Sequence, residues 1–277
     1  MSAGSGDPAA DGGDLDAQLK RRSRSFDAWA LDYDRYRPTY PQGLFDHIAA
    51  RLDLPADAVV ADLGAGTGKA ARQMARRGWQ VIALEPGEGM LDVLRARAAQ
   101  EGLVIEARLG AAEETGLGDA SVDLVTAAQA YHWFDKARAV PEMARIVHPG
   151  GGVALFWNAR ADDRSDFLAA YTDLMSHFLP EEHIDRRVRS SSAPGELEAG
   201  GLFVADDRVE IRHEVEMAAD DFVSLTFTAS QVRLFVDNEA QERLRNELRE
   251  LTRTYFEDRP VKVPYDVDVY VARRVGG

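Results

Sequence analysis

Cysteine is absent from all 277 residues of this chain. Its absence excludes disulfide bonds, thiolate nucleophiles and cysteine-ligated metal centres, and it is typical of proteins from a reducing compartment. The chain also lacks an apolar run of about 18 residues, the length from which a helix can span a membrane. Residues 1–18 lack the basic and then apolar order of a secretory signal, so we expect a disordered tail over residues 1–25. Together these features predict a cytoplasmic protein.

Positive charge is scarce, since 33 basic residues stand against 47 acidic ones and the formal net charge is −14. A surface this acidic repels the phosphates of nucleic acids and anionic membranes over long range. The basic stretch KRRSRS at residues 20–25 is short and is typical of a solvated segment. We therefore expect a small-molecule partner, and neither a nucleic acid nor a membrane.

Histidine is rare as well, with six in the chain. His177 and His183 flank two glutamates, but they lack the spacing of four residues that places two histidines on one helical face around zinc. The sequence therefore predicts no metal site.

Short apolar runs alternate with helical patterns between residues 58 and 157. The predicted strands span residues 58–63, 79–85, 103–110, 121–130 and 151–158. Near-continuous apolar strands separated by helices predict a parallel sheet that is covered on both faces. The helix before the fifth strand contains Pro141, which predicts a kink or a restart there.

The second half of the chain has a different pattern. Residues 208–217 and 265–274 alternate apolar and polar side chains, which predicts a pair of antiparallel strands at the sheet edge. Residues 220–257 are helical and charged, and we expect this insertion to cover the binding pocket as a helical cap. The predicted fold is a doubly wound α/β domain over residues 26–277, with a mostly parallel seven-stranded sheet and an antiparallel last strand.

A glycine-rich turn, ADLGAGTGK, follows the first predicted strand and indicates a nucleotide site. Leu63 and Ala70 stand where a Walker phosphate loop needs glycine and serine or threonine. A dinucleotide fingerprint needs glycine or alanine where Lys69 stands, and Asp62 would bring negative charge close to a pyrophosphate. Glu85, at the end of the second strand, suits the ribose of NAD or of any other adenosine ligand. An NAD-dependent oxidoreductase is therefore a weaker alternative.

Further segments continue this pattern in order: ADLGAGTGKAARQMARRG, VIALEPGEGML, GAAEETGLGDASVDLVTAAQAYHWFD and MARIVHPGGGVALFWN. Their order and spacing resemble class I S-adenosylmethionine-dependent methyltransferases. The YHWF tetrapeptide resembles the small-molecule branch related to trans-aconitate methyltransferases. The resemblance is strong over residues 26–160 and weak elsewhere. It implies a Rossmann-like fold and in-line transfer of a methyl group from S-adenosyl-L-methionine to O, N or C of a small organic molecule, with S-adenosyl-L-homocysteine as product.

The resemblance also implies a set of cofactor-binding residues. In this family the glycine turn lets the backbone approach the cofactor, the acid before it orients the amino end, and Glu85 accepts the ribose hydroxyls. The implied set is Tyr33, Arg37, Asp62, Gly64, Ala65, Gly66, Glu85, Pro86, Met90, Ala112, Glu113 and Gln129. Pro86, Met90 and the loop with Ala112 and Glu113 would lie near the adenine, and Gln129 beside the methionine portion.

An N-terminal lid over residues 26–50 is implied in the same way. Its Tyr33 and Arg37 would lie near the cofactor carboxylate, which a guanidinium binds with two parallel hydrogen bonds. A surface ion pair of Arg37 with Asp32 or Asp34 is the alternative.

The YHWF segment would lie where the methyl group points. We expect Tyr131, Trp133 and Trp157 to wall the acceptor pocket and to exclude water. His132 is the candidate general base for a hydroxyl acceptor, since its ordinary pKa lies near neutrality. A structural hydrogen bond is the alternative, and a carboxylate acceptor would need no base. A cofactor-binding protein of this fold that does not methylate, such as a cyclase, is also compatible with these motifs, which leave the acceptor atom, the oligomeric state and the pathway open.

Overall fold

Five apolar segments form the parallel part of a central sheet, as the sequence predicts. The computed structural model describes residues 30–180, 192–206 and 208–276. The parallel strands are β1 (Val59–Leu63), β2 (Gln80–Glu85), β3 (Ile105–Leu109), β4 (Val122–Ala128) and β5 (Val147–Arg160). They lie in the order β3-β2-β1-β4-β5, so the strand order reverses between β1 and β4. Ligands of doubly wound sheets bind at such a reversal, beyond the carboxyl ends of the strands.

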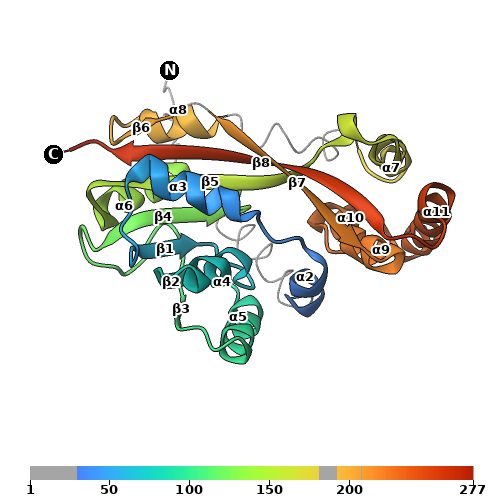
Figure 1. The fold of residues 1–277 in the computed structure, drawn as a ribbon, viewed down its shortest axis with the longest axis horizontal. Helices are drawn as coiled ribbons and strands as arrows, with labels where there is room; N and C mark the ends of the chain where they lie inside the picture. The colour runs from blue at the N-terminus through green and yellow to red at the C-terminus, as the bar shows by residue number, and fades with distance from the viewer. Residues whose placement is uncertain (1–29, 181–191, 207, 277) are drawn as a thin grey trace, which may run out of the picture.

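The antiparallel part of the sheet is built around β8 (Val261–Arg274), which lies inside the sheet (Figure 1). β8 pairs with β5 on one side, and with both β6 (Phe203–Ala205) and β7 (Val209–Met217) on the other. The sheet thus has eight strands in the described residues, one more than the seven predicted, because β6 was not expected. The buried residues of β8 are nearly continuous, whereas β7 alternates between half-buried and exposed residues, which explains why β7 forms the edge.

Helices cover both faces of the sheet, and alternate strand residues point to opposite faces. Val60 packs on the side of α3 (Gln42–Leu52), α4 (Lys69–Arg76) and α5 (Glu88–Gln100). Ala61 and Leu63 pack on the side of α6 (Lys136–Ile146) and α8 (Ala193–Glu198). Asp135 is the N-cap residue of α6, and its carboxylate accepts the Ala137 N–H at 3.1 Å. The helix runs through Pro141 without a restart.

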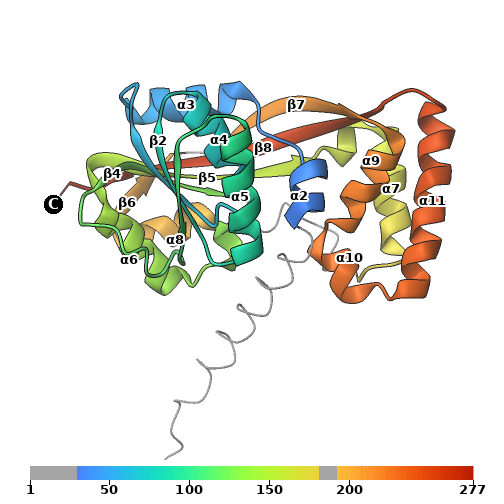
Figure 2. The same ribbon diagram turned by 90° about the horizontal axis from the view of Figure 1, so that it is seen from below.

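A third group of helices packs beyond the ends of β7 and β8, and is called the end helices below (Figure 1). They are α7 (Asp166–Ser176), α9 (Ala219–Phe227), α10 (Ser230–Phe235) and α11 (Asn238–Phe256). Their apolar core includes the first residues of β8, such as Val261 and Val263. The short helix α2 (Ala30–Tyr36) contacts both α5 and α9, so it lies between the sheet domain and the end helices (Figure 2).

No helix within the described ranges has the length and apolar composition that crossing a bilayer requires. The basic stretch 20–25, the predicted tail and His183 lie outside the described residues.

Candidate cofactor and acceptor site

The glycine turn between β1 and α4 uses its glycines for two different purposes. Gly64 and Gly66 have φ angles of +67° and +57°, a region that favours glycine. A Cβ on Gly64 would lie 2.7 Å from the Cβ of Ala130, whereas a Cβ on Gly66 would meet nothing within 4 Å. Gly64 is therefore required for packing against the segment after β4, and Gly66 leaves its backbone open to a ligand.

The carboxylate of Glu85 at the end of β2 is held by this turn. One oxygen accepts the Gly66 N–H at 2.8 Å and the other accepts the Gly87 N–H at 2.9 Å. The side chain is 8% exposed. These two bonds orient the Glu85 carboxylate, and each oxygen of a carboxylate has two acceptor positions.

Two buried oxygens next to the turn have no hydrogen-bond partner among the described residues: Asp62 Oδ2 and Thr67 Oγ1. The other Asp62 oxygen accepts the Thr126 hydroxyl at 2.7 Å. Burial raises the pKa of Asp62 to about 7; the charge of Glu85 acts in the same direction, and the hydrogen bonds from Thr126 and the Ala71 N–H oppose it. Unpaired buried oxygens are costly, and a cationic donor would satisfy them.

One cavity runs from the glycine turn, past the ends of β4 and β5, to the end helices. Its wall consists of Tyr33, Arg37, Pro38, Tyr40, Gly64, Ala65, Gly66, Thr67, Lys69, Ala70, Ala128, Gln129, His132, Trp133, Trp157, Asn158, Ala159, Arg160, Tyr171, Leu225, Thr226, Ala229, Ser230, Gln231, Tyr265 and Asp268. The structure thus brings together Tyr33, Arg37, the first three turn residues, Gln129, His132, Trp133 and Trp157 of the predicted set.

The remaining predicted residues do not line this cavity. Met90 is buried beside Ala30, and Pro86 is exposed. Ala112 is buried in the core, and a Glu113 oxygen accepts the Asp135 N–H at 2.7 Å at the start of α6. Their expected place around an adenine stays a prediction.

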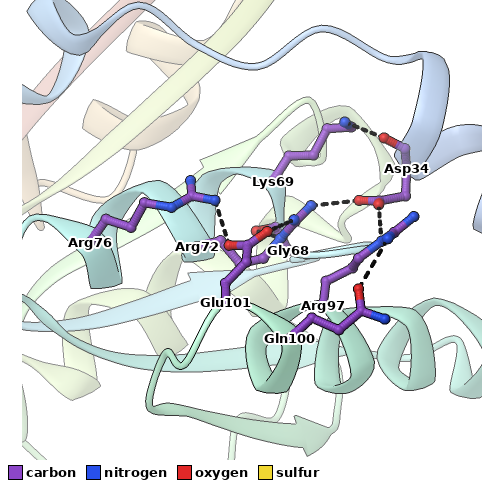
Figure 3. A network of polar contacts seen from close by, with 8 residues as sticks. All are labelled: Asp34, Gly68, Lys69, Arg72, Arg76, Arg97, Gln100 and Glu101. Carbon is purple, nitrogen blue, oxygen red and sulfur yellow. Dashed lines mark hydrogen bonds and ion pairs between the residues drawn. The ribbon is translucent and has the colours of Figure 1, made fainter.

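The lid helix α2 is fastened to α4 and α5 through Asp34, which is 6% exposed. Its carboxylate pairs with Arg72 and with Arg97, the latter at 2.7 Å, while its carbonyl accepts the Lys69 ammonium (Figure 3). Burial lowers the pKa of Lys69 to about 8; Asp34 opposes this effect, and neighbouring arginines, Arg72 first, add to it. Glu101 extends the network toward solvent.

The lid also contacts the end helices. The Arg37 Nε–H donates to the Thr228 hydroxyl at 2.8 Å, and its guanidinium lies 5.4 Å from the centre of the Tyr33 ring. Among the ion pairs of the described residues, none joins Arg37 to Asp32 or Asp34. The guanidinium therefore lies at the cavity wall, and no carboxylate of the described residues forms an ion pair with it.

His132 lies on a single 3-10 turn (Tyr131–Trp133) that follows β4. The Trp157 indole N–H donates to His132 Nδ1 at 3.3 Å. Tyr131 is 1% exposed and packs edge-on against Trp157, with ring centres 6.5 Å apart. Tyr131 thus lies in the core behind the wall, and Trp133 and Trp157 lie in the wall itself.

Sequence reasoning missed several wall residues, above all Thr67 and Arg160. Arg160 ends β5, and its guanidinium lies 4.2 Å from the centre of the Tyr171 ring. No ion pair joins Arg160 to a carboxylate in the part of the chain that the structure describes. The sequence signal for Arg160 was a cation at the carboxyl end of a buried strand. Its neighbours Tyr171, on α7, and Tyr265, on β8, come from other elements, and the sequence did not indicate that they lie near it. No cluster of three metal-ligating side chains occurs in the described ranges.

Known proteins are similar to this chain in sequence and in structure. Residues 61–155 match a family model described as a methyltransferase domain. This match runs from β1 into β5 and includes the glycine turn. An uncharacterized methyltransferase of Mycobacterium tuberculosis is 49% identical over 143 residues, which are 51% of this chain and 55% of the relative. An uncharacterized methyltransferase-like protein of Schizosaccharomyces pombe is 37% identical over 140 residues, 50% of this chain and 53% of the relative. The alignments thus span about half the length of the curated relatives.

Solved structures share the fold of this chain over most of its length. A protein of Anaeromyxobacter dehalogenans, assigned without proof of activity as a type II methyltransferase, has 25% identity and a TM-score of 0.63, covering 86% of this chain and 98% of that one. The [4+2]-cyclase SpnF has 15% identity and a TM-score of 0.58, covering 94% and 97%. The second likeness concerns the fold alone.

Proposed function

We propose that this chain transfers the methyl group of S-adenosyl-L-methionine to a small acceptor molecule that carries an anionic group. The observation that carries the proposal is the single cavity that joins the glycine turn to the end helices. We infer that two ligands would bind in it end to end, one against the turn and one under the end helices. The matched methyltransferase domain, residues 61–155, supplies the turn but not the end helices.

The residues at the turn suit this cofactor. Glu85 would accept the ribose hydroxyls, and the unpaired oxygens of Asp62 and Thr67 suit a positively charged amino group. Arg37 would bind the carboxylate of the same ligand. When bound, the cofactor supplies a methyl group on a positively charged sulfur for in-line displacement. The chain contributes positioning and a dry site, with Trp133 and Trp157 in the wall.

Arg160 favours an anionic acceptor. Its partly buried guanidinium faces the cavity from the side of the end helices and contacts the Tyr171 ring. No carboxylate of the described residues forms an ion pair with it, although the charge of Asp162 acts on it. A buried charge is costly unless it is paired, and the cavity acid Asp268 already pairs with Arg208 at 2.8 Å. A carboxylate or another anion on the acceptor would pair with Arg160.

The cofactor is tested by calorimetric titration with S-adenosyl-L-homocysteine, with NAD in a parallel titration. We expect binding of the homocysteine compound and a loss of roughly 10- to 100-fold in affinity for Glu85→Ala, since hydrogen bonds to a charged group contribute about 1.5–3 kcal/mol each. Binding of NAD without binding of S-adenosyl-L-homocysteine would contradict the proposal and support an oxidoreductase.

The acceptor is tested with cofactor carrying a radiolabelled methyl group and a panel of small carboxylic acids paired with their neutral amides. We expect label in the acids, and a KM raised at least tenfold in Arg160→Gln. The control variant Arg212→Gln changes an exposed arginine on β7, outside the cavity. Equal labelling of acids and amides would contradict the role of Arg160.

The fold is compatible with one other outcome, because a cyclase shares it. Tight cofactor binding without methyl transfer to any acid or amide would favour a catalyst that binds the cofactor but does not methylate.

A further inference from the structure

Trp157 is held in a fixed position between the sheet and the cavity. It lies on β5, is 5% exposed, and its backbone pairs with Asp268 of β8. The rings of Tyr131 and Tyr270 pack edge-on against its indole, with centres 6.5 and 6.0 Å away. In this position the indole N–H donates to Nδ1 of His132 at 3.3 Å.

The direction of this hydrogen bond is set by chemistry. An indole nitrogen can only donate, so His132 Nδ1 has to accept. A neutral imidazole carries one proton, and that proton is therefore on Nε2. Protonation of Nδ1 would place two N–H groups against each other and break the bond to Trp157.

The imidazole also packs against a second indole. Its ring centre lies 4.7 Å from that of Trp133. The Lys136 ammonium donates to the backbone carbonyl of His132 at 3.3 Å and so helps to hold the turn that carries the ring. The ring is half-buried and lines the cavity. Its orientation therefore follows from the short helical turn and Trp157 together.

We propose that Trp157 is a positioning residue that keeps the proton of His132 on Nε2, so that His132 acts in the acceptor pocket as a hydrogen-bond donor and not as a general base. The role in the pocket rests on the proposed function; the protonation of the ring does not. A donor at this place selects an acceptor whose reacting atom already has an available lone pair. An acceptor that enters as an anion loses no proton when that lone pair bonds to the methyl carbon and the carbon–sulfur electron pair returns to sulfur.

The protonation state is measured by nitrogen NMR of the full chain labelled at histidine, without cofactor or acceptor, with His132→Gln identifying the signal. We expect neutral His132 to carry its proton on Nε2 and to show an unprotonated Nδ1. In Trp157→Phe, which keeps a ring but removes the donor, the Nδ1 signal should shift toward a mixture of both forms. Trp133→Phe removes the other indole beside the same imidazole and should leave the nitrogen signals in the Nε2-protonated pattern.

A proton on Nδ1 in the unmodified protein would overturn the proposal, as would unchanged His132 signals in a folded Trp157→Phe variant. Acceptors from the labelling panel provide a second readout. Gln can present an N–H near the position of His Nε2, so His132→Gln should retain several-fold more activity than His132→Ala. Equal loss in both variants would instead indicate a base. Failure to find any acceptor would count against the proposed function and leave the NMR result standing.

Discussion

At the scale of single residues, Gly64 and Gly66 have the same backbone conformation but different surroundings. Alanine at either position costs about 1–2 kcal/mol for the left-handed backbone. At Gly64 the contact with Ala130 adds about 1–3 kcal/mol of overpacking. We therefore expect Gly64→Ala to lower the free energy of unfolding more than Gly66→Ala in chemical denaturation.

Ligand binding should show the opposite order. Gly66→Ala places a methyl group in the open space above the turn, so it should weaken binding of S-adenosyl-L-homocysteine at least tenfold while the protein stays folded. Unimpaired binding by Gly66→Ala would show that the ligand does not approach this backbone.

Asp62 predicts a pH dependence of stability. Its pKa is about 7 in the folded protein against an ordinary value of 3.8. As pH rises from 3.8 to about 7, the unfolded chain loses this proton while the folded chain keeps it, so stability falls over this window and stays lower above it. Between pH 5 and pH 8, the free energy of unfolding should therefore decrease less in Asp62→Asn than in the unmodified protein, by a difference on the order of 2–3 kcal/mol.

Urea denaturation of both proteins at the two pH values measures this difference. Comparing the change with pH, rather than the absolute stability, cancels the effect of the amide itself. A full pH dependence in Asp62→Asn would show that another group is responsible.

At the scale of elements, the lid α2 is attached to α4 and α5 through one residue, Asp34. Asp34 pairs with Arg72 and Arg97 and accepts from Lys69, so Asp34→Asn removes the charge that two guanidinium groups share. Removing one member of a buried ion pair costs about 3 kcal/mol or more. We expect faster hydrogen exchange in residues 30–36 and faster dissociation of S-adenosyl-L-homocysteine.

Arg76→Gln is the matched control, because it removes an ion pair at the solvent end of the same network (Figure 3). Its side chain is 49% exposed, and exposed pairs contribute little. If both variants accelerate dissociation equally, the network as a whole, and not Asp34, fastens the lid.

At the scale of the whole molecule, β8 joins two cores. Val261 and Val263 pack with the end helices, while Val267 and Val269 pack against α3 and α4 on the sheet. Because one strand belongs to both cores, we expect them to unfold together. Phe222 is fully buried among the end helices, 5.0 Å from Phe167 between ring centres.

Phe222→Ala should therefore lower the free energy of unfolding by about 3–5 kcal/mol, while unfolding remains a single transition. Leu91→Ala, on the buried face of α5, should lower the free energy of unfolding by about 2–5 kcal/mol with the same shape of transition. Circular dichroism and calorimetry would detect this. A separate early transition in Phe222→Ala would mean that the end helices unfold on their own.

The sequence by itself determined the parallel strands, the glycine turn and the segment after β4, because their signals are local. Apolar runs, glycines and a tetrapeptide act over a few neighbouring residues, and the family resemblance adds their order. It also predicted that Arg37, His132 and Trp157 belong to one site; the three residues line one cavity, and their roles stay predictions.

Only the tertiary structure decided how β8 enters the sheet, that Arg160 faces the cavity, and that the indole N–H of Trp157 donates to His132. Each of these depends on contacts between distant segments: β5 with β8, β5 with α7, and Trp157 with a turn 25 residues earlier. The prediction of His132 as a candidate base came from its residue type and its place in the YHWF segment, with a structural hydrogen bond as the alternative. Its hydrogen bond to Trp157 arises from packing across the sheet, which no pattern of neighbouring residues contains.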